Sequence, residues 1–104
     1  MTDGIAVEYL CCQIAQQQAD PFEAAICKAM GLLDGEPTVK AYEITKSGDG
    51  LGAYTVRIVW GRWQDQSAYV AGNPNYKNLI ALIAPFRQQM TEMKFYSVLQ
   101  AKKA

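Results

Sequence analysis

Two strand-like segments joined by a glycine-rich connection constrain the fold of this chain more than any other feature. Residues 38–46 and 53–63 are rich in β-branched and aromatic side chains, as strands are. The connection between them, Ser47 to Gly52, has hairpin length and carries glycine at every other position. The sequence therefore predicts an antiparallel pair of strands. In the second strand, the side chains expected to face the core are Tyr54, Val56, Ile58 and Trp60.

A helix is predicted to begin at Asp20. This residue offers an N-cap acceptor, Pro21 suits the first helical position, and Glu23 follows three residues after the cap. The helix is expected to end near residue 34, because Gly35 can form a C-terminal cap and Pro37 prevents continuation. Its predicted buried stripe consists of Phe22, Ile26, Ala29, Met30 and Leu33.

Asn73 and Pro74 repeat this pattern of a cap followed by proline, and they predict the start of a further helix. Pro85 interrupts it, so we expect a kink or a break into two short helices. The core side of this helix is predicted to comprise Tyr76, Leu79, Leu82, Ile83, Phe86 and Met90.

Three other segments have less regular patterns. Residues 4–18 carry apolar side chains at helical spacing, which favours a first helix with a second apolar face on its opposite side. Residues 64–71 permit a short strand. Residues 92–101 fit a strand or a helical continuation, and we favour a strand that joins the sheet.

Together these elements predict one α+β domain over residues 1–104. Its architecture is a two-layer sandwich, in which an antiparallel sheet of three to four strands carries about three helices on one face. The expected order of elements is ααββ(β)αβ. A chain of 104 residues has the usual size of a single domain with one core.

The composition restricts the chemistry that this domain can perform. The chain contains no histidine, the commonest general base and metal ligand. Its cysteines, Cys11, Cys12 and Cys27, lack the spacing of a zinc site. The glycines between the two strands follow a strand without opening a helix, so they indicate a turn and no phosphate-binding loop. We therefore predict no metal, no cofactor and no catalytic residue.

The balance of charges argues against nucleic acid as a partner. Ten basic and ten acidic residues cancel, and neither a signal peptide nor a membrane-spanning segment is evident. An odd number of cysteines, two of them adjacent, is typical of reduced thiols. These features predict a cytoplasmic protein with no membrane contact.

Aromatic and basic residues around the end of the second strand suggest a binding surface. Alternation places Arg57 on the face opposite Trp60, and Arg62 and Trp63 follow directly, with Tyr69 at the edge. A bulge at Gly61 is the alternative, and it would turn Trp63 into the core. We predict that Arg57, Arg62, Trp63 and Tyr69 bind a partner.

The second apolar face of residues 4–18 suggests self-association. Ile5, Tyr9 and Cys12 would form the interface of a homo-oligomer, most simply a dimer. These observations favour a non-enzymatic protein-binding or assembly module that contacts an unknown protein and itself. The alternative is a small enzyme or ligand-binding protein, with a pocket lined by Tyr, Trp and Arg side chains between sheet and helices.

Overall fold

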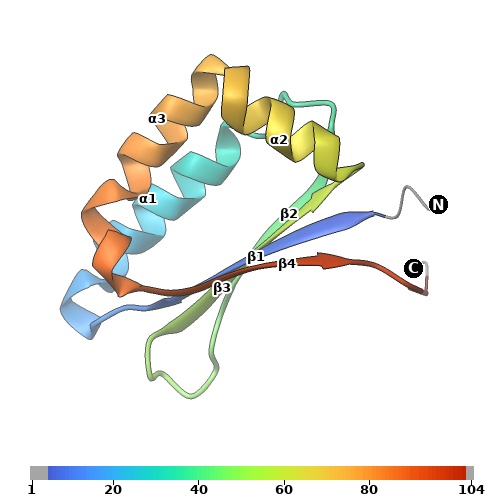
Figure 1. Cartoon of the computed structure of the whole chain (residues 1–104). Coiled ribbons are helices and arrows are strands. Elements are labelled where there is room, and N and C mark those ends of the chain that lie inside the picture. Colours follow the sequence, from blue (N-terminus) through green and yellow to red (C-terminus); the bar gives the residue numbers. More distant parts are fainter. Residues whose placement is uncertain (1–4, 103–104) are drawn as a thin grey trace.

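One antiparallel sheet with helices on a single face forms the whole of the computed structural model, which describes residues 5–102 (Figure 1). The sheet holds four strands in the order β2-β3-β1-β4. Along the chain the elements are β1 (Ala6–Gln13), η1 (Gln16–Gln18), α1 (Ala19–Gly31), β2 (Val39–Lys46), β3 (Ala53–Trp60), α2 (Trp63–Gly72), α3 (Pro74–Ile83), η2 (Ala84–Gln89) and β4 (Met90–Ser97).

The two halves of the chain each contribute a strand, a helical segment and a strand. Strand β1 lies between β3 and β4 and pairs antiparallel with both. Strand β2 continues into β3 through the glycine-rich hairpin. The resulting βαββαβ order, with β1 and β3 in the centre of the sheet, is the ferredoxin-like arrangement. The predicted fold class, a two-layer α+β sandwich, is confirmed.

The N-terminal ends of helices α1 and α3 lie close to where the sequence predicts them. The side chain of Asn73 accepts a hydrogen bond from the backbone N–H of Asn75 at 2.9 Å, which confirms the predicted cap of α3. Helix α1 begins one residue before Asp20 because η1 leads directly into it, and Asp20 lies in its first turn. At Pro85, the chain passes from α3 into the 3₁₀ segment η2.

The expected first helix over residues 4–18 is wrong, because residues 6–13 form the central strand β1. Apolar side chains lie on both faces of this strand, so their spacing matched a helix as well as it matched alternation. On the face toward the helices, Glu8 interrupts an otherwise apolar row. The members of that row are Ala6, Leu10, Cys12 and Ile14.

The short strand expected at residues 64–71 is also wrong, because this segment belongs to helix α2. Only Tyr69 of this helix is buried, and no side chain caps its N-terminus. A helix with a single buried side chain lacks the periodic stripe by which a helix is recognised in a sequence.

An aromatic cluster fills the centre of the core between α1 and the sheet. Phe22 is fully buried, and its ring centroid lies 4.9 Å from that of Tyr54 and 5.2 Å from that of Phe86. Both contacts have the edge-to-face geometry that aromatic rings prefer. The cluster ties α1 to β3 and η2. All five residues of the predicted α1 stripe are buried: Phe22, Ile26, Ala29, Met30 and Leu33.

Within residues 5–102, no helix has the length and apolar character that crossing a membrane requires.

Candidate functional site

An ionisable group lies on the helix-facing side of the central strand. Glu8 is in the middle of β1, opposite Ile58 on β3 and Phe95 on β4. Its position in an apolar row directs the carboxyl group into the space between the sheet and the helices. A partly buried carboxyl group in such surroundings is a candidate functional group.

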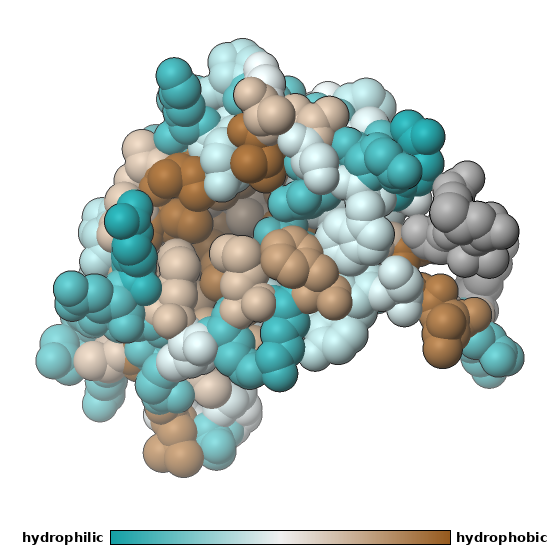
Figure 2. Space-filling model, viewed as in Figure 1, coloured by the Kyte–Doolittle hydropathy of each residue, from teal (hydrophilic) through white to brown (hydrophobic). Residues whose placement is uncertain are grey.

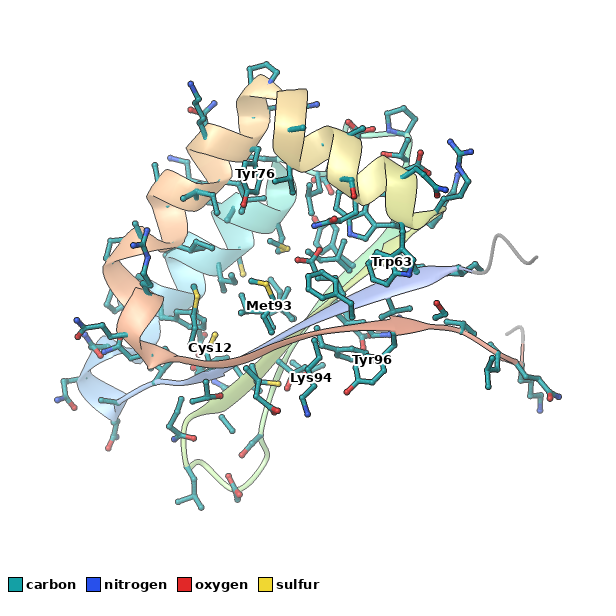
Figure 3. The ribbon with its side chains drawn as sticks, viewed as in Figure 1. Cys12, Trp63, Tyr76, Met93, Lys94 and Tyr96 are labelled. Carbon is teal, nitrogen blue, oxygen red and sulfur yellow. The ribbon has the colours of Figure 1, made fainter. Side chains whose placement is uncertain are left out.

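The space around Glu8 is a cleft that consists of two adjoining cavities, of about 160 and 70 Å³. Figure 2 shows this side of the molecule hollowed between the helical layer and the strand in front of it. In Figure 3, Tyr76 of α3 and Met93 of β4 point toward one another across the gap. The two cavities share the lining residues Glu8, Ile58, Tyr76, Leu79 and Met93.

Two opposing effects set the pKa of Glu8. Burial among apolar side chains raises this pKa above its ordinary value, and a hydrogen bond from Trp60 partly offsets the rise. The indole Nε1 of Trp60 donates to Oε1 of Glu8 at 3.0 Å. Among residues 5–102, no other donor and no basic side chain is bonded to this carboxyl group. Oε2 therefore has no hydrogen-bond partner among these residues.

Replacing Trp60 with phenylalanine is expected to raise the pKa of Glu8 further. The ring stays apolar, but the N–H donor that stabilises the carboxylate is lost. A carboxyl-carbon NMR titration measures the change. Ile58→Val is the matched control, because it trims the same cleft and keeps the hydrogen bond. An unchanged or lower pKa in Trp60→Phe would contradict this account of the site.

Two tyrosines form the helical wall of the cleft. Tyr69 is 5% exposed, and its hydroxyl group has no hydrogen-bond partner in the described part of the chain. Burial, together with the charge of Glu36, raises the pKa of Tyr69, so the hydroxyl group keeps its proton. The Tyr69 ring lies 5.6 Å from that of Trp60 and 6.1 Å from that of Tyr76. The wall is therefore aromatic with polar hydroxyl groups.

Apolar side chains at the mouth of the cleft extend it along β4. Met93 and Phe95 are 56% and 49% exposed. The ring of Trp63, at the start of α2, lies 5.3 Å from that of Phe95, and its Nε1 lies 3.4 Å from Oγ of Ser97 (Figure 3). Trp63 therefore joins α2 to β4 where the sheet is otherwise uncovered.

The four predicted binding residues do not form one surface. Arg57 lies on the outer face of the sheet, as alternation predicted, and its Nε donates to the Tyr9 hydroxyl at 3.2 Å. Arg62 pairs with Asp65 at 3.3 Å near the start of α2. Strand β3 ends at Trp60, so Trp63 lies on the helix side, and Tyr69 belongs to the core. The four residues lie apart because the prediction extended strand alternation beyond Trp60, where β3 ends, and their role in binding a partner stays a prediction.

The three residues predicted for self-association also separate. Tyr9 lies on the outer face, with its ring 5.4 Å from that of Tyr96, and Ile5 is exposed just before β1. Cys12 is 3% exposed and belongs to the core, on the opposite face of β1 from Tyr9. The correction follows from β1 being a strand, in which positions 9 and 12 face opposite sides.

Self-association through Tyr9 and Ile5 stays a prediction, and one substitution tests it. Wild-type protein is expected to sediment as a dimer and Tyr9→Glu as a monomer, because the substitution removes the aromatic ring that packs against Tyr96 on the outer face. Ser67→Glu, on the exposed side of α2, is the control and should leave the dimer intact. A monomeric wild-type protein at high concentration would contradict the prediction.

Glu8 and Met93 are not among the residues predicted from the sequence, and Tyr76 was predicted to lie in the core. The signal that could have revealed Glu8 is its place as the single charge in an alternating apolar row, from Ala6 to Ile14. Met93 and Tyr76 carry no comparable signal, because only the packing of α3 over β4 brings them together.

Several solved structures share this fold. SnoaB, a cofactor-independent oxygenase from Streptomyces nogalater, superimposes with a TM-score of 0.74 at 14% identity, over 96% of this chain and 97% of that one. A protein of Caulobacter crescentus, provisionally named an antibiotic biosynthesis monooxygenase, gives 0.76 at 17% identity, over 94% and 92%. A conserved protein from Methanosarcina mazei gives 0.77 at 12%, over 91% and 93%. At such identities the likeness establishes the fold.

Comparison with protein-family models finds no match to this sequence. Comparison with curated protein sequences finds none either.

These findings overturn the expectation of a non-enzymatic protein-binding or assembly module. Proteins of this fold bear the names of monooxygenases and an oxygenase, and none of those reported above is named as an assembly module. The alternative interpretation, a small enzyme or ligand-binding protein with a pocket between sheet and helices, agrees better with the cleft at Glu8. That pocket is lined by tyrosine and tryptophan, whereas Arg57 lies on the opposite face of the sheet.

Proposed function

We propose that the protein is a small enzyme that binds a flat, largely apolar molecule in the cleft and uses Glu8 to take a proton from it. The removal of this proton prepares the molecule for oxygenation by O2. The observation that carries the proposal is the carboxyl group of Glu8, held by Trp60 with one oxygen free, in a cleft of aromatic and aliphatic side chains.

The cleft restricts the ligand in size and charge. Its cavities, of about 160 and 70 Å³, are smaller than the roughly 300–1,000 Å³ of sites for drug-sized ligands. One or two fused rings therefore suit the interior, and a longer molecule would extend over Met93 and Phe95. Because Glu8 has no basic partner among the described residues, a ligand with a negative charge would be repelled. A neutral ligand with an O–H donor fits best.

A phenol illustrates the chemistry. The carboxylate of Glu8 accepts the O–H proton of α-naphthol, which leaves a naphtholate whose para carbon is rich in electrons. That carbon transfers an electron to O2, and the two radicals combine into a carbon–oxygen bond. Glu8 returns its proton to the peroxide, which loses water to give para-naphthoquinone. One naphthol and one O2 thus yield one quinone and one water.

The raised pKa of Glu8 suits this role. A carboxylate with a raised pKa is a stronger base than an ordinary one, and the aromatic walls keep water from competing for the proton. The similarity in fold to SnoaB also supports the proposal, because SnoaB is described as an oxygenase that needs no cofactor. An enzyme of this kind requires a base in an apolar cleft, and Glu8 among its aromatic and aliphatic neighbours meets that requirement.

Three ligands with the same rings test the proposal by titration calorimetry. α-Naphthol has a hydroxyl donor, naphthalene has none, and α-naphthoate carries a negative charge. We expect α-naphthol to bind most tightly and α-naphthoate least, because the carboxylate of Glu8 attracts a donor and repels an anion. Binding of α-naphthoate as tight as that of α-naphthol would overturn the proposal.

A further inference from the structure

Strand β4 forms one edge of the sheet, and within residues 5–102 no strand pairs with its free side. Seven of its eight residues are exposed, among them the large apolar side chains of Met93, Phe95 and Tyr96. An exposed edge strand with such side chains is a surface to which another strand can add. We propose that β4 pairs antiparallel with β4 of a second copy of this chain, so that the two sheets become one.

The other edge strand, β2, is protected against pairing of this kind. Its register with β3 shifts between Val39 and Ala41, and none of its large apolar side chains is exposed. Bulges and polar side chains are the usual means by which natural sheets avoid association at their edges. Along β4, by contrast, the register with β1 is regular from Glu92 to Ser97. Of the two edges, β4 therefore offers the regular and partly apolar strand.

The two faces of β4 differ in chemistry. Met93 and Phe95 lie on the side of the cleft, whereas Glu92, Lys94 and Tyr96 lie on the outer face (Figure 3). On the outer face, Nζ of Lys94 lies 2.7 Å from Oε2 of Glu92. When a two-fold axis perpendicular to the sheet relates two antiparallel strands, each residue lies opposite a residue of the same face. Only registers that keep these faces together are therefore possible.

The charges favour one of these registers. If the axis passes through Met93, Glu92 of each copy lies opposite Lys94 of the other, and the junction carries two pairs of opposite charges. An axis at Glu92 or at Lys94 would place two like charges opposite one another, and an axis at Phe95 would leave both charges without an opposite partner. Opposite charges across a strand pair are favourable, and like charges are unfavourable. The pairing is therefore centred at Met93.

This pairing also affects the mouth of the cleft. Met93 lines the cleft at Glu8 and is 56% exposed. In the paired state it lies opposite Met93 of the second copy, with the two Cβ atoms about 4.5–5.5 Å apart. Each copy therefore covers part of the other's cleft mouth. The Tyr9 ring packs against that of Tyr96 on the outer face of the same strand, so the edge gives the predicted self-association a defined surface.

Charge reversal tests the register in the full chain, by sedimentation over a range of concentrations. Glu92→Lys and Lys94→Glu each place two like-charge pairs at the junction, and each should weaken the dimer about ten- to a hundredfold. The double variant exchanges the charges and should restore association to the wild-type level. Glu43→Lys, at an exposed position of β2, is the control and should change nothing. Circular dichroism checks that each variant is folded.

Disulfide cross-linking reads the same register without changing the charges. In a background that carries Cys11→Ser and Cys27→Ser, Met93→Cys should form a disulfide between two chains, because position 93 faces itself across the axis. Phe95→Cys lies on the same face two residues further along, where the two copies of position 95 are about 13 Å apart. It should form no such disulfide.

Three outcomes would overturn the proposal. The first is a monomeric wild-type protein at high concentration. The second is a dimer that neither single charge reversal weakens, which would show that another surface associates. The third is cross-linking of Phe95→Cys in preference to Met93→Cys, which would show a different register. No ligand enters these measurements, so none of these outcomes bears on the proposed function of the cleft.

Discussion

Glu8→Gln is expected to lose oxygenation of α-naphthol by a factor of about 10²–10⁴, the usual contribution of a general base. Glutamine keeps the size of the side chain and can still accept the hydrogen bond from Trp60, but it cannot take a proton. The protein should therefore stay folded and keep its cleft while the rate falls. Oxygen uptake and quinone absorbance both measure that rate.

The same substitution should raise the thermal stability at neutral pH or leave it unchanged. Burial raises the pKa of Glu8 above its ordinary value of 4.5, so between these two values the folded chain binds more protons than the unfolded chain. The contribution of Glu8 to stability accordingly falls as the pH rises from the unfolded pKa through the folded one. Glutamine does not titrate, so the stability of the Glu8→Gln variant should not show this fall with rising pH.

Glu43→Gln is the matched control for the rate measurement, because Glu43 is exposed on β2 and lies outside the cleft. It should leave the oxygenation rate unchanged. If Glu8→Gln and Glu43→Gln have equal activity, Glu8 is not the base. If Glu8→Gln unfolds the protein at neutral pH, the carboxylate stabilises the fold and the proposed electrostatics are wrong.

Phe22→Ala is expected to destabilise the protein by about 3–5 kcal/mol, the usual result of truncating a buried aromatic side chain. Its ring contacts those of Tyr54 and Phe86, so the cavity would open where α1, β3 and η2 meet. Small domains have a total stability of about 5–15 kcal/mol, and the variant would therefore be marginally folded. Urea unfolding followed by circular dichroism measures the loss.

Phe95→Ala is the control for this prediction. It removes the same number of atoms from a side chain that is half exposed at the mouth of the cleft, where its main aromatic contact is Trp63. The expected destabilisation is about 1 kcal/mol or less. Equal losses from Phe22→Ala and Phe95→Ala would show that the aromatic cluster does not dominate the core.

The sequence alone predicts the parts of this fold that local signals control. The alternation from Tyr54 to Trp60 identifies the core face of β3, and all four residues of that set are buried. The stripe of α1 and the cap at Asn73 are likewise local, because helix periodicity and capping act over a few neighbouring residues. Strand pairing across the centre of the sheet is not local, and its register could not be predicted from the sequence.

Strand β1 was missed for a reason connected with the site. Its outer face carries Val7, Tyr9 and Cys11, so both faces are largely apolar, as expected for a central strand. Glu8 puts a charge at one of the inward-facing positions of this strand. The residues from Ala6 to Gln13 therefore do not alternate between apolar and polar in the way that identifies a strand. A residue that violates the local pattern is often retained for function, and the failure of the prediction therefore coincides with the candidate base.

The position of Trp63 could not be read from alternation either. The strand ends at Trp60, and the N–H of Gly61 donates to the carbonyl of Thr38 at 3.1 Å, after which the chain enters α2. The turn carries Trp63 to the helix side of the sheet, where it meets Phe95 of a strand that is distant in sequence. Contacts of this kind depend on tertiary packing. They cannot be predicted from the residues that neighbour Trp63 in the sequence.

The position of bound α-naphthol tests the account most directly. Intermolecular NMR contacts between the ligand and the methyl groups of the protein distinguish the cleft from the outer face of the sheet. We predict contacts to the side chains of Ile58, Leu79 and Met93, which line the cleft around Glu8. Contacts to Thr55 on the outer face, with none to the cleft residues, would contradict the assignment of the cleft as the site where this protein acts.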